Sequence, residues 1–169
     1  QKSDTIAYRL NHLRDYQGGR LAKRYQKFVD AFDNLRLREA VAMGYHKLLS
    51  YKDEYEVARL HLSTLEKAKE NFDNVDKITF HLAPPMLGGK DANGRPQKRE
   101  FGPWMLRVFG VLSRLKSLRG TVFDPFGYTA ERKMERKLIK QYENDFKLLA
   151  PLMNDDNLDL YVELALLPF

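Results

Sequence analysis

The sequence predicts a mainly helical fold: one compact domain over residues 1–169, with a small β-hairpin or short strand pair near residues 77–101. Two observations favour helices. Apolar residues recur every three or four positions over most of the chain, and turn-forming residues gather in a few short clusters. A third observation marks the hairpin, because apolar and polar side chains alternate between residues 78 and 82 with the period of a half-buried strand.

The N-terminal part of the chain predicts helices. Residues 6–32 place apolar side chains on one face, and Gly18-Gly19 is expected to split or bend this stretch, since glycine weakens a helix. A second helix is expected over residues 37–63, where apolar residues again repeat at three or four. Residues 65–72 are polar and predict a short, frayed helix that runs into a turn.

The hairpin is expected next. Residues 78–82 form the first strand, in which His81 faces away from the apolar side. Two prolines at positions 84 and 85 end this strand, and residues 97–101 are expected to return as the second, with Asn93-Gly94 near the reversal.

The C-terminal part predicts three more helices. Pro103 suits the first turn of a helix that is expected to end at Arg119-Gly120. After a turn at residues 124–127, Thr129 is the expected N-cap of a helix that reaches about Ala150. Residues 158–167 predict a last short helix. The longest of the three is expected to point these side chains inward: Met134, Leu138, Tyr142, Phe146 and Leu149.

Composition excludes several classes of site. The chain has no cysteine, so it offers no disulfide, no thiolate ligand for zinc or an iron–sulfur cluster, and no Cys nucleophile. Its four histidines lack the spacing that places two ligands on one helix face, and no serine lies in a G-x-S-x-G setting. No apolar run approaches the ~20 residues that span a bilayer. We therefore expect a cytoplasmic protein without a metal site, a membrane contact or a catalytic residue.

Charge points to a binding region. The net charge is +6, and residues 83–123 carry eight basic and two acidic side chains, whereas residues 151–169 carry four acidic and none basic. Cations interleaved with Phe101 and Trp104 suit phosphates with a stacked base, as in a nucleotide-bearing cofactor. The alternatives are a solvated basic face and a Trp104 buried in the core, and without a nucleic-acid-binding signature nucleic acid is disfavoured. The candidate binding residues are Arg95, Lys98, Arg99, Arg107, Arg119 and His81.

Other polar residues predict structural roles. Asp53 and Glu56 share a helix face, and Lys52 and Arg59 can pair with Glu56. Asp124 can accept hydrogen bonds from the backbone of the turn that follows it. The candidate structural residues are Asp53, Glu56, Trp104, Asp124, Tyr128 and Arg132.

Several strings of residues, taken together, resemble one known domain. They are residues 51–60 (YKDEYEVARL), 81–85 (HLAPP), 101–105 (FGPWM), 118–121 (LRGT), 124–132 (DPFGYTAER) and 134–136 (MER). In this order they resemble the C-terminal domain of indolepyruvate ferredoxin oxidoreductases, the long, fused members of the 2-oxoacid:ferredoxin oxidoreductase superfamily.

The resemblance implies a larger parent enzyme, of which residues 1–169 would be a fragment. That parent would oxidatively decarboxylate an arylpyruvate to an acyl-coenzyme A and pass electrons to ferredoxin. Thiamine diphosphate, Mg²⁺ and [4Fe–4S] clusters would do this chemistry in other domains, with no cofactor in this chain. We expect the chain to be an interface with other domains or subunits; the alternative is a contact with an anionic partner, ferredoxin or coenzyme A, through residues 83–123.

Overall fold

A computed structural model of the chain describes residues 2–71, 78–82, 89 and 97–169. In the described residues the regular structure is seven α-helices, three short 3₁₀ turns and two strands, which confirms the mainly helical fold class. The chain divides into two compact units. Unit 1 comprises residues 1–53 and 116–169, and unit 2 comprises residues 54–115.

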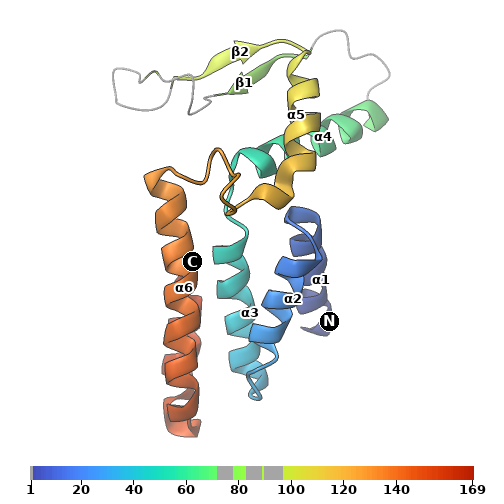
Figure 1. Ribbon diagram of the computed structural model, residues 1–169. Coiled ribbons are helices and arrows are strands. Elements are labelled where there is room, and N and C mark those ends of the chain that lie inside the picture. Colours follow the sequence, from blue (N-terminus) through green and yellow to red (C-terminus); the bar gives the residue numbers. More distant parts are fainter. Residues whose placement is uncertain (1, 72–77, 83–88, 90–96) are drawn as a thin grey trace. The chain divides into compact units, whose positions relative to one another are not determined.

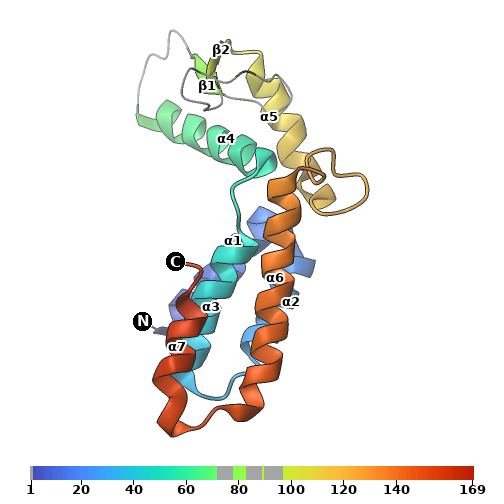
Figure 2. The same ribbon diagram turned by 90° about the vertical axis from the view of Figure 1, so that its left-hand side faces the viewer.

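Unit 1 is a bundle of five helices. They are α1 (Lys2–Tyr16), α2 (Gly19–Val29), α3 (Leu35–Leu49), α6 (Ala130–Leu149) and α7 (Leu158–Leu166). Figures 1 and 2 show α3 between α2 and α6, with α7 packed along α3. Gly18, at φ +127°, separates α1 from α2, so the predicted split at Gly18-Gly19 is confirmed. Thr129 caps α6 as expected, because its side chain accepts a hydrogen bond from the Arg132 backbone N–H.

Unit 2 pairs two helices with a hairpin. It contains α4 (Glu54–Asn71), β1 (Phe80–Leu82), β2 (Arg99–Phe101) and α5 (Met105–Arg114), and α4 packs against α5. The strands are antiparallel, with Phe80 opposite Phe101 and His81 opposite Glu100, which confirms the predicted strand pair. The expected reversal at Asn93-Gly94 lies outside the described residues.

The single helix expected over residues 37–63 is wrong, because the chain leaves the helical path between α3 and α4. Ser50 ends α3, and its hydroxyl donates to the His46 carbonyl at 2.7 Å. Asp53 is then bound by Arg119, 66 residues further along the chain, a contact that no local pattern encodes. Residues 65–71 are helical as expected, but they continue α4 without a break instead of forming a separate short helix.

The end of α5 and the inward face of α6 also differ from the predictions. Helix α5 ends at Arg114, and a 3₁₀ turn over Leu115–Leu118 precedes the expected stop at Arg119-Gly120. In α6, Tyr142 and Phe146 are buried as predicted, but Met134 and Leu138 are 59% and 44% exposed. Met134 and Leu138 follow the apolar periodicity of α6, but in the described chain they lie on the surface rather than in the core.

Tyrosine side chains form the centre of unit 1. The rings of Tyr25, Tyr45 and Tyr142 stack in sequence, with centroid separations of 5.9 and 6.0 Å. The Tyr25 hydroxyl donates to the Ala42 carbonyl at 3.1 Å, and the Tyr142 hydroxyl donates to the Ala165 carbonyl at 3.0 Å. Since a buried phenol needs a hydrogen-bond acceptor, these partners let unit 1 bury large rings without leaving a hydroxyl unsatisfied.

Gly44 allows α7 to approach α3 closely. A Cβ atom at this position would lie 1.9 Å from the Ala165 carbonyl oxygen and 2.9 Å from the Tyr142 hydroxyl. The glycine therefore fixes the packing of α7 on α3, which positions the groove described below.

Unit 2 has a smaller core. Ala58, Phe80, Met105 and Phe109 form its cluster of buried apolar residues, and the His61 ring stacks on Phe109 at 5.0 Å. None of the described helices in either unit is long and apolar enough to cross a membrane.

Candidate functional site

Arg119 is buried in unit 1, and its guanidinium binds groups of the same unit. This corrects the prediction that Arg119 binds an anionic partner. Its guanidinium holds both carboxylate oxygens of Asp53, one at 2.8 Å, and donates to the Tyr16 carbonyl at 2.8 Å. The guanidinium carbon also lies 3.6 Å from the centroid of the Tyr16 ring. Burial alone would lower the pKa of Arg119, but the hydrogen bond and charge of Asp53 outweigh burial and raise it. Arg119 is therefore a structural cation.

Asp124 organises the turn before α6. Its carboxylate accepts hydrogen bonds from the Gly120 N–H at 2.7 Å and from the Phe126 N–H at 3.1 Å, and its side chain is buried. The second bond is the one expected from the following turn. Gly120 adopts φ +73°, a conformation that favours glycine.

Tyr128 and Arg132 also make contacts within unit 1. The Tyr128 hydroxyl donates to the Val122 carbonyl at 2.7 Å, although the ring is exposed. Arg132 pairs with Glu135 at 2.6 Å and lies 5.2 Å from the Tyr51 ring centroid. The Tyr128 bond therefore closes the turn on itself, whereas Arg132 joins the first turn of α6 to Tyr51, which follows α3.

The expected acidic network is divided between the units. In unit 2, Arg59 binds both carboxylate oxygens of Glu56, at 2.7 and 2.9 Å. Asp53 belongs to unit 1, where it pairs with Arg119 instead of joining the Glu56–Arg59 pair.

The remaining candidate binding residues lie in unit 2. His81 on β1 and Lys98, Arg99 and Arg107 are exposed, and His81 Nδ1 lies 3.9 Å from a carboxylate oxygen of Glu100, its partner across the strand pair. Arg95 lies outside the described residues.

Trp104 is 57% exposed, so the prediction that it is a core residue is wrong. Met105 and Phe109 face the core instead, which turns the opposite face of the helix outward. That outward face carries four exposed apolar residues at helical spacing and two exposed arginines; we call it the α5 stripe. Its members are Trp104, Arg107, Val108, Val111, Arg114 and Leu115.

An apolar groove lies on the other unit, between α3, α6 and α7. Its volume is about 550 Å³, and leucines from all three helices line it. Leu138, Leu148 and Leu167 are 44%, 73% and 75% exposed. We call this the leucine groove, defined by Leu48, Leu138, Gln141, Tyr142, Asp145, Phe146, Leu148, Leu149, Leu164, Leu167 and Pro168.

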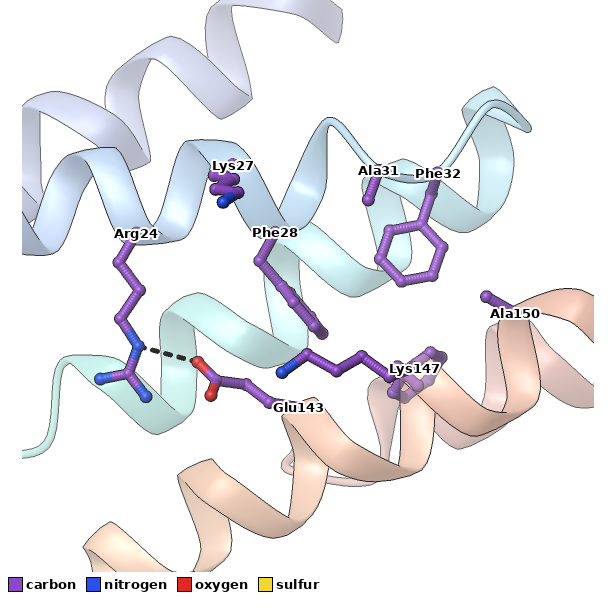
Figure 3. A pocket seen from close by; sticks show the side chains of 9 residues that line it. Arg24, Lys27, Phe28, Ala31, Phe32, Glu143, Lys147 and Ala150 are labelled. Carbon is purple, nitrogen blue, oxygen red and sulfur yellow. Dashed lines mark hydrogen bonds and ion pairs between the residues drawn. The ribbon is translucent and has the colours of Figure 1, made fainter.

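A second groove of about 500 Å³ runs between α2 and α6 in the same unit (Figure 3). Phe28, Phe32 and Phe146 contribute apolar side chains, whereas Arg24, Lys27 and Lys147 add positive charge. We call it the α2–α6 groove, defined by Arg24, Lys27, Phe28, Ala31, Phe32, Glu143, Phe146, Lys147 and Ala150.

Glu143 is the acidic member of the α2–α6 groove, and it is already paired. Its Oε1 accepts from Arg24 Nε at 2.8 Å and from the Tyr45 hydroxyl. Burial would raise the pKa of Glu143, but the bonds from Arg24 and Tyr45 and the charges of Arg24 and Lys147 outweigh it and lower that pKa. The carboxylate therefore stays ionised and holds the Arg24 side chain in place.

The sequence contains a signal for this region that the charge count over residues 83–123 overlooks. Helix α2 carries four basic residues and no acidic one, and the four are spaced i, i+3, i+4 and i+7, which places them on one face. All four are exposed, and we call them the α2 basic face: Arg20, Lys23, Arg24 and Lys27. The position of Lys147 across the groove depends on tertiary packing and has no comparable signal.

Two histidines meet in unit 1. His12 Nδ1 lies 3.0 Å from His46 Nε2, at hydrogen-bond distance. Burial, followed by the nearby charges of His12 and Arg9, lowers the pKa of His46 to about 4. Within the described residues no three His, Asp or Glu side chains are grouped so as to hold a metal ion.

Comparison with known families gives one match. Residues 2–169 match the family described as a family of unknown function (DUF6537), so the match includes nearly all of both units. The chain belongs to the DUF6537 family. No curated protein and no solved structure matches this DUF6537 chain.

Proposed function

We propose that this DUF6537 domain is a non-catalytic interface domain of an indolepyruvate (2-oxoacid):ferredoxin oxidoreductase. In this proposal the parent enzyme decarboxylates an arylpyruvate oxidatively, and its other domains carry thiamine diphosphate, Mg²⁺ and the [4Fe–4S] clusters. The ordered strings at residues 51–60, 81–85, 101–105, 118–121, 124–132 and 134–136 support the choice of parent. A chain without cysteine cannot ligate the clusters itself.

The leucine groove is the observation that carries the interface role. Its leucines come from three helices, and three of them keep large exposed fractions in unit 1. A contiguous exposed apolar surface is typical of a protein–protein contact, since water contact with such a surface is unfavourable. Neighbouring domains or subunits of the parent would cover it.

The test substitutes exposed leucines in the full-length parent enzyme. Leu138→Gln, Leu148→Gln and Leu167→Gln together make the groove polar while the buried side chains stay unchanged. Because apolar contacts carry little charge, we expect the triple variant to lose subunit association at both about 0.1 M and about 1 M salt. Sedimentation velocity measures the association.

Leu35→Gln with Val122→Gln is the matched control, since both residues are exposed apolar residues of unit 1 that lie outside the groove. The control is expected to assemble normally. Normal assembly and normal turnover of the triple variant would contradict the interface role of this surface.

A second candidate function is contact with an anionic partner, either ferredoxin or coenzyme A, through the α5 stripe. The observation in its favour is that Arg107 and Arg114 are exposed on the face that also exposes Trp104, and tryptophan and arginine are enriched in binding hot spots. Here Arg107→Glu with Arg114→Glu should slow ferredoxin reduction at low salt, and the difference from the unsubstituted enzyme should vanish at high salt. Equal rates at low salt would remove this candidate.

A further inference from the structure

We propose that the α2–α6 groove is a docking site for an acidic amphipathic helix of a partner protein. The proposal rests on the shape and charge of unit 1 and is independent of the identity of the parent enzyme. It concerns a surface separate from the α5 stripe and from most of the leucine groove, with Phe146 the one residue that lines both grooves.

The shape of the groove fits a helix. On α2 the lining residues are Arg24, Lys27 and Phe28, and Ala31 extends this row two residues beyond the end of the helix. On α6 the lining positions are 143, 146 and 147, and Ala150 directly follows the end of that helix. Figure 3 shows the two rows running in the same order along the groove. Five to six residues of helix rise about 8–9 Å, so the helical parts of the two rows run alongside each other for about one and a half turns. Such a groove receives the apolar face of a third helix.

The charge of the groove selects an acidic occupant. Two members of the α2 basic face, Arg24 and Lys27, line one side, and Lys147 lies on the other. Within the described residues Lys27 and Lys147 make no ion pair, and the one acidic lining residue, Glu143, is held by Arg24 and Tyr45. Carboxylates that flank an apolar stripe would therefore meet the ammonium groups of Lys27 and Lys147 at the rim.

The floor of the groove favours a protein over nucleic acid. Single-stranded nucleic acid is held by stacking of bases on open aromatic faces. Phe32 and Phe146 are only 4% and 3% exposed, and they pack against each other at 5.9 Å in an edge-on arrangement. Neither ring can offer a face to a base, and the half-buried Phe28 ring is already packed against Phe32, Tyr45 and Tyr142.

The experiment titrates the 1–169 chain into a fluorescein-labelled synthetic helix whose leucine stripe is flanked by glutamates. Fluorescence anisotropy measures the affinity. We expect Lys27→Glu with Lys147→Glu to weaken binding by about tenfold or more, since two rim charges then repel the probe. Lys133→Glu with Lys137→Glu is the matched control, because both lysines are exposed on α6, lie outside the groove and change the net charge equally. The control should bind nearly as tightly as the unsubstituted chain.

Three further probes complete the test. A peptide with its leucines replaced by serine should bind at least about tenfold more weakly, because the apolar face is lost. Single-stranded DNA should not compete with the acidic helix for the groove. In amide NMR spectra the acidic helix should shift signals of Arg24, Lys27, Ala31, Lys147 and Ala150. The proposal is overturned if the acidic helix does not bind, or if the two lysine pairs weaken its binding equally. It is also overturned if the serine peptide binds undiminished, if DNA competes, or if the NMR shifts are confined to other helices.

Discussion

Unit 1 and unit 2 bury their aromatic residues in different ways. Unit 1 encloses three stacked tyrosines whose hydroxyls each have an acceptor, and it also encloses the Asp53–Arg119 pair. Unit 2 encloses Tyr55, Phe80 and Phe109 but leaves Trp104 exposed on the α5 stripe. Unit 1 thus combines specific polar bonds with a large apolar core, whereas the cluster of buried apolar residues in unit 2 is smaller. Substitutions inside unit 1 should therefore cost more stability than equivalent ones in unit 2 or on the surface.

The largest expected effect is loss of the buried ion pair in unit 1. Arg119→Ala would leave the Asp53 carboxylate buried without its partner, so we expect a loss of about 3–5 kcal/mol in the free energy of unfolding. Urea unfolding followed by circular dichroism measures it. Arg36→Ala removes an arginine from an exposed pair with Asp159 and should cost less than about 1 kcal/mol. Equal costs for the two variants would contradict the special role of the buried pair.

The next prediction applies one substitution to both units. Gly44→Ala would place a methyl group against the Ala165 carbonyl, and we expect a loss of about 1–3 kcal/mol as α7 moves away from α3. Gly110→Ala in α5 meets no atom within 4 Å and should gain about 0.5–1 kcal/mol from helix propensity. Thermal unfolding should show a lower midpoint for Gly44→Ala and a higher midpoint for Gly110→Ala than for the unsubstituted chain. A stabilised Gly44→Ala chain would show that α7 does not pack closely at this point.

Asp124→Ala tests the turn before α6. The substitution leaves the Gly120 and Phe126 N–H groups without their carboxylate acceptor, so we expect a loss of about 0.5–2 kcal/mol, as for a lost cap. The midpoint of urea unfolding should fall accordingly. An unchanged midpoint, together with lost activity of the proposed parent enzyme, would instead give Asp124 a direct functional role.

The smallest expected effect is a pH dependence that arises in unit 1. The pKa of His46 is lowered to about 4 when folded and is about 6.5 when unfolded, so the unfolded chain binds the extra proton between these values. Stability should therefore fall as pH drops from about 6.5 to about 4, and because the side chain is partly exposed we expect only about 1 kcal/mol.

The variant for this prediction is His46→Gln, compared with the unsubstituted chain. It removes the imidazole whose pKa is lowered by burial and should flatten the dependence of the urea midpoint on pH across this window. An identical slope for His46→Gln and the unsubstituted chain would exclude His46 as its source.

Local patterns in the sequence predict much of the fold. Gly18 separates two helices, Thr129 caps α6, and the alternation around Phe80 marks β1, because each signal acts within a few residues. Local patterns do not predict the break between α3 and α4, since Asp53 in this break pairs with Arg119, 66 residues further along the chain. Periodicity predicts a core position for Trp104, which is wrong, because periodicity identifies an apolar face but not the side on which other elements pack.

The candidate sites were less predictable than the fold. The arginines of α5 could be recognised from the sequence as exposed cations, but Arg119 could not be separated from them, because its buried partner is remote in the chain. The α2 basic face can be recognised from the spacing of its residues alone. The groove beside it cannot, because its other side is formed by α6, which lies more than 100 residues later in the chain.

The most direct test of the account removes residues 1–169 from the proposed parent, a 2-oxoacid:ferredoxin oxidoreductase, and measures subunit association and ferredoxin reduction together. If the domain is a non-catalytic interface, the truncated enzyme retains its thiamine diphosphate and iron content but loses association, efficient electron delivery or both. Full assembly and full ferredoxin reduction by the truncated enzyme would contradict the account.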